Sequence, residues 1–310
     1  MRIVYFGTPD FAVDSLDAIL HSSHEVAAVV TVPDRQAGRG QKVVFSAVKQ
    51  YALDHSLPLL QPEKLRDEDF LASLQALQAD CFVVVAFRML PEVVWSMPHY
   101  GTFNLHASLL PRYRGAAPIN WAIINGEQET GVTTFLLNHH IDEGAILLQE
   151  RTHITPEDNA GTLHDRLASM GRTLVVRTLD GLADDSLTPL PQHGTPCPAP
   201  KIFKEDCIID FRRPGRQVVD FIRGLAPYPA ATMTLVSPKG EKVLFKIFDA
   251  RFHEAPAATE NTLFCDGKKV LKIGVADGFV EILSLQMAGK KKNSIEEFLR
   301  GNNVTNWLLV

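Results

Sequence analysis

The first half of the chain alternates short apolar runs, rich in β-forming residues, with segments whose apolar residues recur at helical spacing. This alternation is typical of a parallel sheet whose strands are connected by covering helices. The expected strands are residues 3–6, 26–32, 81–86, 102–105, 131–137 and 145–154, and the expected helices are residues 11–20, 69–78 and 162–182. We therefore predict an α/β fold with an open, mostly parallel, Rossmann-like sheet.

A proline-rich segment divides the chain. Five prolines lie between residues 189 and 200, which predicts an extended, semi-rigid linker. Beyond it, a helix is expected at residues 216–224, followed by short alternating runs at 231–235, 243–252, 262–265, 270–275 and 279–285. Such short strands separated by turns predict a smaller C-terminal β-barrel of OB-like type. We expect an α/β domain at residues 1–188, a linker at 189–204 and the barrel domain at 205–310.

The composition excludes several classes of protein. With 45% apolar and 22% charged residues, the chain is not disordered, collagen-like or a coiled coil. Its formal charge of −5 argues against a generally basic protein that coats nucleic acid. The charge is uneven, however, because residues 1–204 carry 16 basic and 23 acidic side chains, whereas residues 205–310 carry 15 and 13. The net charge therefore does not exclude a local basic surface on an otherwise acidic chain.

The cysteines and the N-terminus indicate the compartment. Cys81, Cys197, Cys207 and Cys265 lie far apart without a CxxC pair, which is typical of reduced thiols rather than of disulfides or a zinc site. The chain enters a strand-like run directly after Met1, without a secretory apolar region. Because no segment approaches the roughly 20 apolar residues of a membrane span, we expect a cytoplasmic protein that does not contact a membrane.

Asn104 and His106 lie at the end of an expected strand. Since they are two residues apart, they face the same side of the sheet at its carboxyl edge, where open α/β sheets bind ligands. A carboxamide beside an imidazole suits a reaction that passes through a tetrahedral oxyanion. From spacing alone, a purely structural histidine is the alternative.

Asp142 lies in a loop between two later strands and is the candidate partner of His106, whose tautomer it would determine. A turn aspartate before Gly144 is one alternative. A metal site formed with His139 and His140 is another, although adjacent histidines in a strand face opposite sides.

Two loops carry further signals. The loop after the first strand has the single glycine Gly7 instead of GxGxxG, which argues against a nicotinamide cofactor; a tight turn capped by Asp10 is the plain alternative. The second loop offers the cations Arg35, Arg39 and Lys42 with two glycines between them. By composition alone it is an ordinary solvated loop.

Together, these motifs resemble the folate-dependent formyltransferases. The strand ending at residues 104–106 continues into Ser108-Leu109-Leu110-Pro111, and further segments match in the same order at residues 3–13, 33–42, 199–206 and 223–230. The resemblance covers the whole chain and is greatest to members that use tRNA. It implies transfer of a formyl group from 10-formyltetrahydrofolate to the α-amino group of methionine esterified to initiator tRNA, for translation initiation.

The resemblance also implies roles for individual residues. Asn104 and His106 would stabilise the oxyanion, and Asp142 would orient His106 and assist proton removal. The residues implied for folate binding are Ala86, Leu90, Ser108, Leu109, Leu110 and Pro111; those implied for tRNA binding are Arg35, Arg39, Lys42 and Lys204. The lysines at 268–269 and 290–292 would bind phosphate or form a solvated face. No metal and no obligate protein partner is implied, and we expect a monomer.

The chain departs from the family pattern at two places, and other activities share the catalytic motifs. Arg88 follows Phe87 where members usually have a small residue. Around Asp142, members commonly have Leu-Asp-Thr-Gly-Asp, whereas residues 141–145 here are Ile-Asp-Glu-Gly-Ala, and the sequence assigns no role to Glu143. A glycinamide ribonucleotide enzyme would not need the residues after 204, and a nucleotide-sugar enzyme or a 10-formyltetrahydrofolate hydrolase has no evident use for the 35–42 loop. A non-catalytic RNA-binding protein on this fold would not need Asn104, His106 and Asp142.

Overall fold

The computed structural model describes residues 1–37, 42–256 and 261–310, with residues 36, 37 and 42 described by their backbone alone. The chain forms two compact units, each built from three segments. The first unit comprises Met1–Gly115, Glu129–Thr152 and His164–Ala199; the second comprises Ala116–Gln128, His153–Leu163 and Pro200–Val310.

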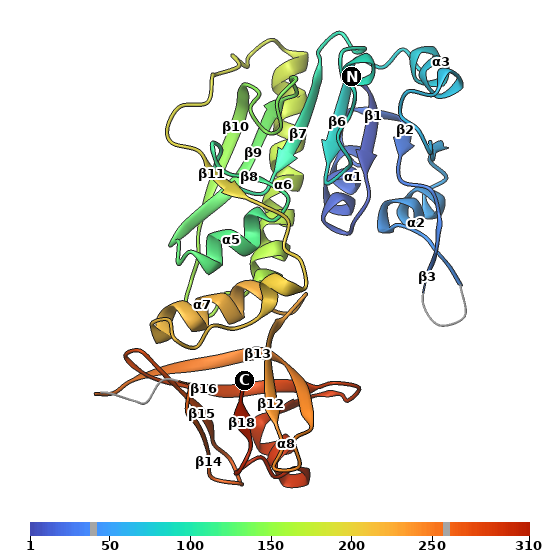
Figure 1. Ribbon diagram of the computed structural model, residues 1–310. Coiled ribbons are helices and arrows are strands. Elements are labelled where there is room, and N and C mark those ends of the chain that lie inside the picture. The colour runs from blue at the N-terminus through green and yellow to red at the C-terminus, as the bar shows by residue number, and fades with distance from the viewer. Residues whose placement is uncertain (38–41, 257–260) are drawn as a thin grey trace. The chain divides into compact units, whose positions relative to one another are not determined.

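A seven-stranded sheet forms the centre of the first unit (Figure 1). Its strands, in spatial order, are β10 (Ile146–His153), β9 (Glu129–Leu136), β7 (Thr102–His106), β6 (Cys81–Val85), β1 (Arg2–Gly7), β2 (Glu25–Val30) and β5 (Leu59–Leu60). The helices of this unit are α1 (Phe11–Leu20), α2 (Ala47–Asp54), α3 (Glu68–Ala76), α4 (Glu92–Trp95) and, from residue 164 on, α6 (Ala160–Ala183).

The strand directions confirm the predicted fold class. The five strands from β5 to β7 pair in parallel, and β9 pairs with β7 antiparallel. The chain builds outward from β1 to β2 and β5, and then returns to the other side of β1 with β6 and β7. The order therefore reverses between β1 and β6, and such a switch point is where open sheets bind ligands beyond their carboxyl ends.

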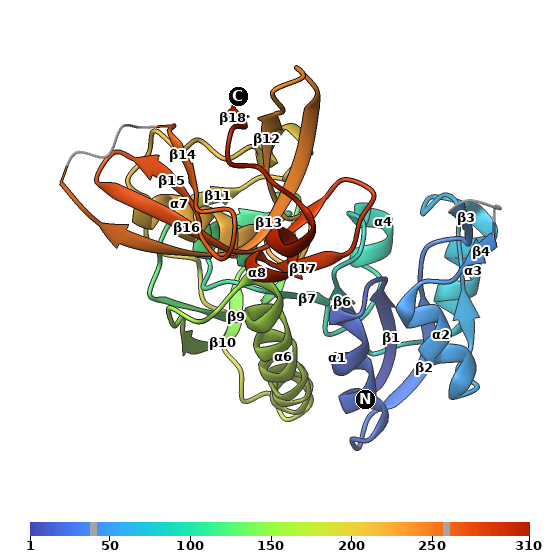
Figure 2. The same cartoon turned by 90° about the horizontal axis from the view of Figure 1, so that it is seen from below.

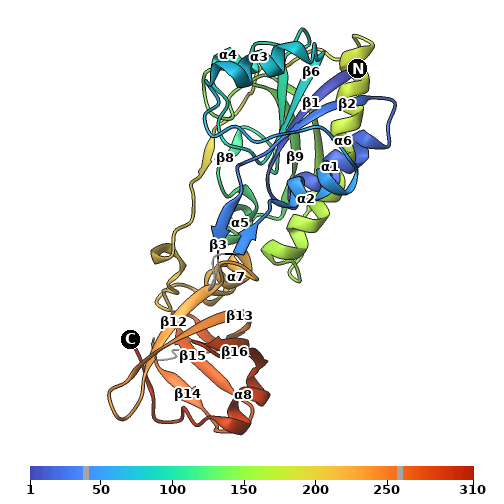
Figure 3. The same cartoon turned by 90° about the vertical axis from the view of Figure 1, so that its right-hand side faces the viewer.

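Alternation along the strands creates two buried faces. Val4, Phe6, Phe82 and Val84 share one buried cluster with residues of α3 and α4. On the other face, α1 contacts β1, β2 and β6, and α6 lies beside α1 (Figures 2 and 3). Because Asn104 pairs in register with Val84, it lies on the α3 and α4 face, whereas Leu105 faces α6.

Helix α1 forms where the sequence predicts it. Asp10 precedes it, and its carboxylate accepts a hydrogen bond from the backbone of Phe11 at 3.0 Å. Phe11, Leu16 and Ile19 are among the residues that it buries, which are spaced to form one helical face. The loop after β1 is therefore a turn capped by Asp10, which the sequence offers as the plain alternative.

Helix α6 crosses β7 closely at Gly171. A Cβ atom at this position would lie 2.6 Å from a terminal methyl carbon of Leu105. Leu105 is buried and stands between Asn104 and His106 in β7, so the contact supports the strand that carries both residues.

We expect Gly171→Val to destabilise the protein by about 1–3 kcal/mol, because the branched side chain overfills this contact. Gly171→Ala should cost less, since the Leu105 methyl can move aside. Urea unfolding of both variants measures the difference. A valine variant as stable as the unmodified protein would show that α6 does not pack tightly here.

Two small sheets complete the first unit. β3 (Arg35–Ala37) pairs antiparallel with β4 (Lys42–Val44), and β8 (Arg112–Gly115) pairs in parallel with β11 (Cys197–Ala199). β11 belongs to the segment that the sequence predicts as a linker. This segment is extended, but it pairs with the first unit through β11 and through Leu190. Its prolines do not prevent the pairing, because only some residues need to form backbone hydrogen bonds and proline is tolerated at a sheet edge.

The second unit contains the predicted small β-barrel. Its strands, in spatial order, are β14 (Leu263–Cys265), β15 (Leu271–Val275), β16 (Gly278–Met287), β13 (Lys242–Glu254), β12 (Ala231–Val236) and β18 (Leu308–Leu309), and β17 (Lys292–Ser294) pairs with β16. The pairings are antiparallel, and the strands curl into a nearly closed barrel (Figure 1). Its helical elements are α5 (Pro118–Ile124), η1 (Glu205–Cys207), α7 (Gly215–Leu225) and α8 (Ile295–Gly301).

Alternating strand residues and the helices fill this barrel. Phe245 and Ile247 of β13 are fully buried and share one core with Phe298 and Leu299 of α8. Helix α5 contacts α7, where the Asn120 side chain donates a 2.7 Å hydrogen bond to a backbone carbonyl. Across both units, no helix in the described part of the chain is long and apolar enough to cross a membrane.

Candidate active site

Asn104 and His106 lie at the carboxyl end of β7, on one face of the sheet, as their spacing predicts. His106 is 6% exposed, whereas Asn104 is partly exposed. Among the residues that the structure describes, none forms a hydrogen bond with the Asn104 side chain. Its carboxamide is therefore available to a bound substrate at the carboxyl end of β7, next to the strand β6 that borders the switch point.

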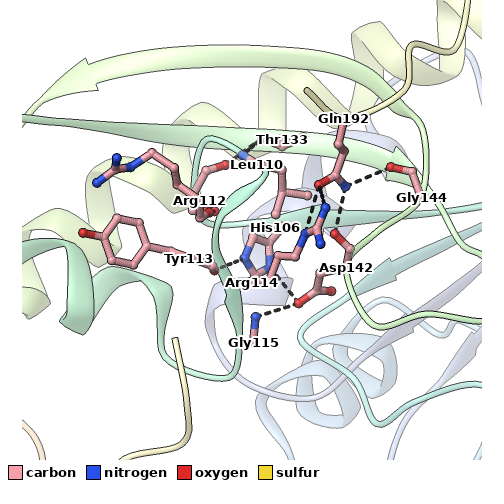
Figure 4. Close-up of polar contacts among 11 residues, drawn as sticks. His106, Leu110, Arg112, Tyr113, Arg114, Gly115, Thr133, Asp142, Gly144 and Gln192 are labelled. Carbon is pink, nitrogen blue, oxygen red and sulfur yellow. Dashed lines mark hydrogen bonds and ion pairs between the residues drawn. The ribbon is translucent and has the colours of Figure 1, made fainter. Parts of the chain in front are cut away.

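The hydrogen bonds of His106 determine which ring nitrogen can react. His106 Nε2 lies 2.7 Å from the carbonyl oxygen of Tyr113 (Figure 4). Because a carbonyl oxygen can only accept, the proton of the neutral ring is on Nε2. Nδ1 then carries the free electron pair, and this nitrogen faces Asp142.

Asp142 is brought to His106 from the loop between β9 and β10. Its Oδ2 lies 3.8 Å from His106 Nδ1, beyond direct hydrogen-bond distance, and accepts a 2.8 Å hydrogen bond from the backbone of Gly115. The Asp142 carboxylate is mostly buried, so its charge acts in a partly desolvated site. His106 Nδ1 is therefore the ring nitrogen that faces this carboxylate.

The Asp142 loop has an unusual backbone. Asp142 has a φ of +55°, in the left-handed region that residues other than glycine adopt uncommonly. Two residues later, Gly144 passes so close to β9 that a Cβ atom would overlap the carbonyl oxygen of Leu136. The carboxylate position therefore depends on a tight and partly strained loop.

The residues implied for folate binding after β7 form a rigid turn. Ser108 is fully buried, and its hydroxyl donates a 2.6 Å hydrogen bond to the carbonyl of Arg112. Thr133 on β9 donates to the Ser108 carbonyl, and its hydroxyl accepts from the backbone of Leu110. Gln149 on β10 donates to the Leu110 carbonyl at 3.0 Å. Thr133 and Gln149, which carry no sequence signal, thus hold this turn.

The side chains in that turn differ in exposure. Leu110 and Pro111 are buried, and Leu109 is half-buried. Because the buried Ser108 hydroxyl donates its proton to the Arg112 carbonyl, it stabilises the turn and is not available as a donor to a ligand.

A second edge segment follows β6. Ala86, exposed and with a φ of +47°, directly follows the strand next to β7, and Leu90 is buried four residues later. The Arg88 guanidinium donates to the carbonyls of Pro62 and Glu63, which follow β5. Burial and the positive charge of Arg35 lower the pKa of Arg88.

No backbone hydrogen bond joins residues 87–90 to another described residue. This stretch therefore presents unpaired donors and acceptors beside the carboxyl ends of β6 and β7.

The residues implied for tRNA binding are divided between the two units. Arg35 is exposed in β3, and Lys42 is described by its backbone in β4. Arg39 lies outside the described residues. Lys204 is exposed before η1 in the second unit.

The base of the β3–β4 hairpin is anchored by an ion pair between buried Lys49 and the more exposed Asp34. Lys49 is 8% exposed, and its Nζ lies 2.8 and 2.7 Å from the two carboxylate oxygens of Asp34. Hydrogen bonds from Lys49 and then Gln61 hold the pKa of Asp34 below its usual range. The pair fixes the start of the hairpin against α2.

The geometry disfavours a metal at the Asp142 loop. His139 faces Glu92, with 3.5 Å between His139 Nε2 and the carboxylate, while Asp142 faces His106. Within the described ranges, no three histidine, cysteine or acidic side chains gather where they could hold a metal ion.

The structure gives Glu143 a contact that the sequence does not indicate. Glu143 Oε1 accepts a 2.8 Å hydrogen bond from Arg114 Nη1. The same guanidinium also contacts Gln192 (Figure 4). Arg114 belongs to β8 and Gln192 to the segment expected to be a linker. Arg114 and Gln192 are 78 residues apart in the chain, so no local sequence pattern predicts their contact.

Comparison with known proteins agrees with this geometry. Residues 1–179 match the family model described as formyl transferase, and residues 201–303 match the model described as formyl transferase, C-terminal domain. The chain is 55% identical over 307 residues to the methionyl-tRNA formyltransferase of Bacteroides thetaiotaomicron, covering 97% of this chain and 95% of that protein. It is 50% identical over 303 residues to the enzyme of the same name from Flavobacterium johnsoniae, covering 97% and 96%.

Solved structures with the same fold are more distant. WlaRD, a sugar 3N-formyl transferase, superposes with a TM-score of 0.65 at 21% identity, covering 94% of this chain and 99% of that one. HypX from Aquifex aeolicus, in complex with tetrahydrofolic acid, superposes with a TM-score of 0.63 at 17% identity, covering 96% of this chain and 47% of that one. These two similarities concern the fold, whereas the family models and the sequence relatives extend to the residues themselves. The chain belongs to the formyl transferase family.

Proposed function

We propose that this enzyme transfers the formyl group of 10-formyltetrahydrofolate to the α-amino group of methionine on initiator tRNA, which supplies the initiator for translation. The observation that carries the proposal is the placement of Asn104, His106 and Asp142 at one sheet edge. It is supported by near full-length identity of 50–55% to relatives named methionyl-tRNA formyltransferase.

Tetrahydrofolate fits the edge segments by the chemistry of their donors. Residues 87–90 offer backbone N–H and C=O groups that pair with no described residue, and a pterin ring carries a matching row of donors and acceptors. Ala86 precedes this stretch and Leu90 is its last residue. The turn at residues 108–111 follows the neighbouring strand, β7. We propose these residues as the folate-binding segments. The folate supplies a formyl group on nitrogen, which is activated toward an amine.

The roles of the polar side chains follow from their geometry. As the amine nitrogen attacks the formyl carbon, the C=O bond opens to an oxyanion, which the Asn104 carboxamide and a protonated His106 Nδ1 would stabilise. His106 Nε2 stays bound to the Tyr113 carbonyl and keeps the ring orientation. The Asp142 carboxylate faces the ring at Nδ1 and assists removal of the amine proton. The proton lost by the amine balances the proton gained by the departing folate nitrogen.

We propose residues 1–188 as the catalytic domain, residues 189–204 as its connecting segment, and residues 205–310 as a tRNA-binding domain. The second region carries 15 basic and 13 acidic side chains, whereas the rest of the chain is acidic. Arg35, Arg39, Lys42 and Lys204 are the proposed tRNA contacts, since guanidinium and ammonium groups bind phosphate directly. We further propose that the enzyme is a cytoplasmic monomer.

The test is a substrate panel. With 10-formyltetrahydrofolate, the enzyme should formylate methionyl initiator tRNA at least about 100-fold faster per enzyme than methionyl elongator tRNA or free methionine, because remote binding energy must position the amine. Acid-gel separation of formylated and free aminoacyl-tRNA measures the rates. Formylation of a nucleotide-linked amino sugar but of no tRNA would overturn the proposal, and so would inactivity toward all of these amines.

A further inference from the structure

Gln192 lies in the proline-rich segment and contacts the Asp142 loop directly. Its Nε2 donates hydrogen bonds to the carbonyl oxygens of Asp142 at 2.8 Å and Gly144 at 2.9 Å. Its Oε1 accepts from Arg114 Nε at 3.1 Å and from the second terminal nitrogen, Nη2, at 2.7 Å. Figure 4 shows the carboxamide between the guanidinium and the loop. A carboxamide offers two donors and two acceptor positions, so this one is fully used.

These partners allow one orientation of the Gln192 side chain. Both loop groups are carbonyls, which only accept, and the guanidinium of Arg114 only donates. A flipped amide would place oxygen against two oxygens and nitrogen against a cation. The network therefore determines the assignment of the amide atoms.

The backbone on either side of Gln192 is docked on the first unit. Two residues before it, Leu190 exchanges two backbone hydrogen bonds with Ile146 of β10, at 2.7 and 2.9 Å. Five residues after it, β11 begins its pairing with β8. Gln192 is half-buried and Arg114 is 21% exposed, so water competes only partly for their contacts. The segment thus delivers a side chain to a defined point.

The carbonyls that Gln192 holds belong to the catalytic loop itself. Asp142 keeps a left-handed φ of +55°, which costs free energy unless neighbouring contacts stabilise it. In this conformation the Asp142 carboxylate reaches the Gly115 amide and faces His106 Nδ1. Arg114, which contacts Gln192, also forms an ion pair with Glu143 of the same loop.

We propose that Gln192 is a positioning residue of the catalytic site: oriented by Arg114, its carboxamide clamps the backbone of the Asp142–Gly144 loop and thereby sets the Asp142 carboxylate against His106. Gln192 acts through Asp142 and does not touch the reacting atoms. This role rests on the proposed function, in which Asp142 assists catalysis.

The kinetic test compares Gln192→Ala, Gln192→Glu and a control, His193→Ala, in the exposed neighbouring residue. Both Gln192 variants should lower kcat about 10- to 100-fold with KM for either substrate changed less than about 2-fold, because a misplaced catalytic group costs rate rather than binding. Gln192→Glu preserves the shape but turns an oxygen toward two carbonyls, so it should be no better than alanine. A normal kcat in Gln192→Glu would show that the side chain only fills space.

A double-mutant cycle asks whether Gln192 acts through Asp142. In an Asp142→Ala background, Gln192→Ala should change the residual kcat less than about 2-fold, because its target is already absent. A full 10- to 100-fold loss in that background would overturn the proposal.

Amide exchange tests the same clamp without any substrate. The Gly115 N–H is protected by Asp142 Oδ2, so NMR-detected exchange at Gly115 reports the carboxylate position. Exchange there should accelerate at least about 10-fold in Gln192→Ala and Gln192→Glu, and not in His193→Ala. Unchanged Gly115 exchange in both Gln192 variants would overturn the positioning role, even if the enzyme acts on a different amine. Conversely, an inactive substrate panel with accelerated exchange would overturn the proposed function alone.

Discussion

Replacing His106 with alanine is expected to lower kcat for formyl transfer by about 10²–10⁴-fold, the range typical of a lost acid–base group. The ring is 6% exposed and is held through Nε2 by the Tyr113 carbonyl, with Nδ1 toward the Asp142 carboxylate. Alanine removes the ring that is proposed to donate to the oxyanion and that the Asp142 carboxylate faces. Single-turnover kinetics with saturating folate and tRNA measure the chemical step.

The matched control is His99→Ala, in an exposed histidine whose ring packs beside Tyr100. It should keep kcat within about 2-fold of the unmodified enzyme, as surface substitutions usually do. Filter binding should show that His106→Ala still binds the tRNA, because the proposed tRNA contacts lie elsewhere. Activity of His106→Ala comparable to that of the control would remove this histidine from the mechanism.

Gly144→Ala is expected to destabilise the protein by about 3 kcal/mol and to lower kcat about 100-fold. An added methyl group would overlap the carbonyl oxygen of Leu136, which is backbone and cannot rotate away. The loop must therefore move away from β9 at this point, and Asp142 moves with it. Urea unfolding and steady-state kinetics measure the two effects.

Gly301→Ala serves as the control for this substitution. A Cβ atom at Gly301 meets no atom within 4 Å in the described part of the chain, and the residue ends helix α8. Its stability and kcat should stay close to those of the unmodified enzyme. If Gly144→Ala also kept its stability and kcat, the loop would tolerate a side chain at residue 144 despite the close Leu136 carbonyl. The position of Asp142 would then not depend on this contact.

Several features of the site follow from local sequence. The placement of Asn104 and His106 on one face requires only the two-residue period of a strand, and the structure has this period in β7. Helix α1 coincides with its predicted bounds because an amphipathic run follows the capping residue Asp10. The barrel of the second unit is likewise confirmed, since short alternating runs between turns have few other solutions.

The interpretation of the proline-rich segment shows where local reasoning ends. Five prolines indicate extended backbone, and the segment is extended, but prolines do not prevent β11 from pairing with β8. Which surface an extended segment lies on depends on groups elsewhere in the chain. The contacts of Gln192 with residues 142 and 144 join positions 50 and 48 residues apart.

By itself, the sequence determined the parallel sheet, the small barrel, and the strand end where Asn104 and His106 face a ligand, because these depend on periodicity and turn residues that are local in the chain. Only the tertiary structure decided how Asp142 meets His106, which nitrogen of His106 is available, and that Gln192 and Arg114 hold the loop. The physical reason is that hydrogen bonds act over about 3 Å between groups whose separation along the chain carries no periodic signal.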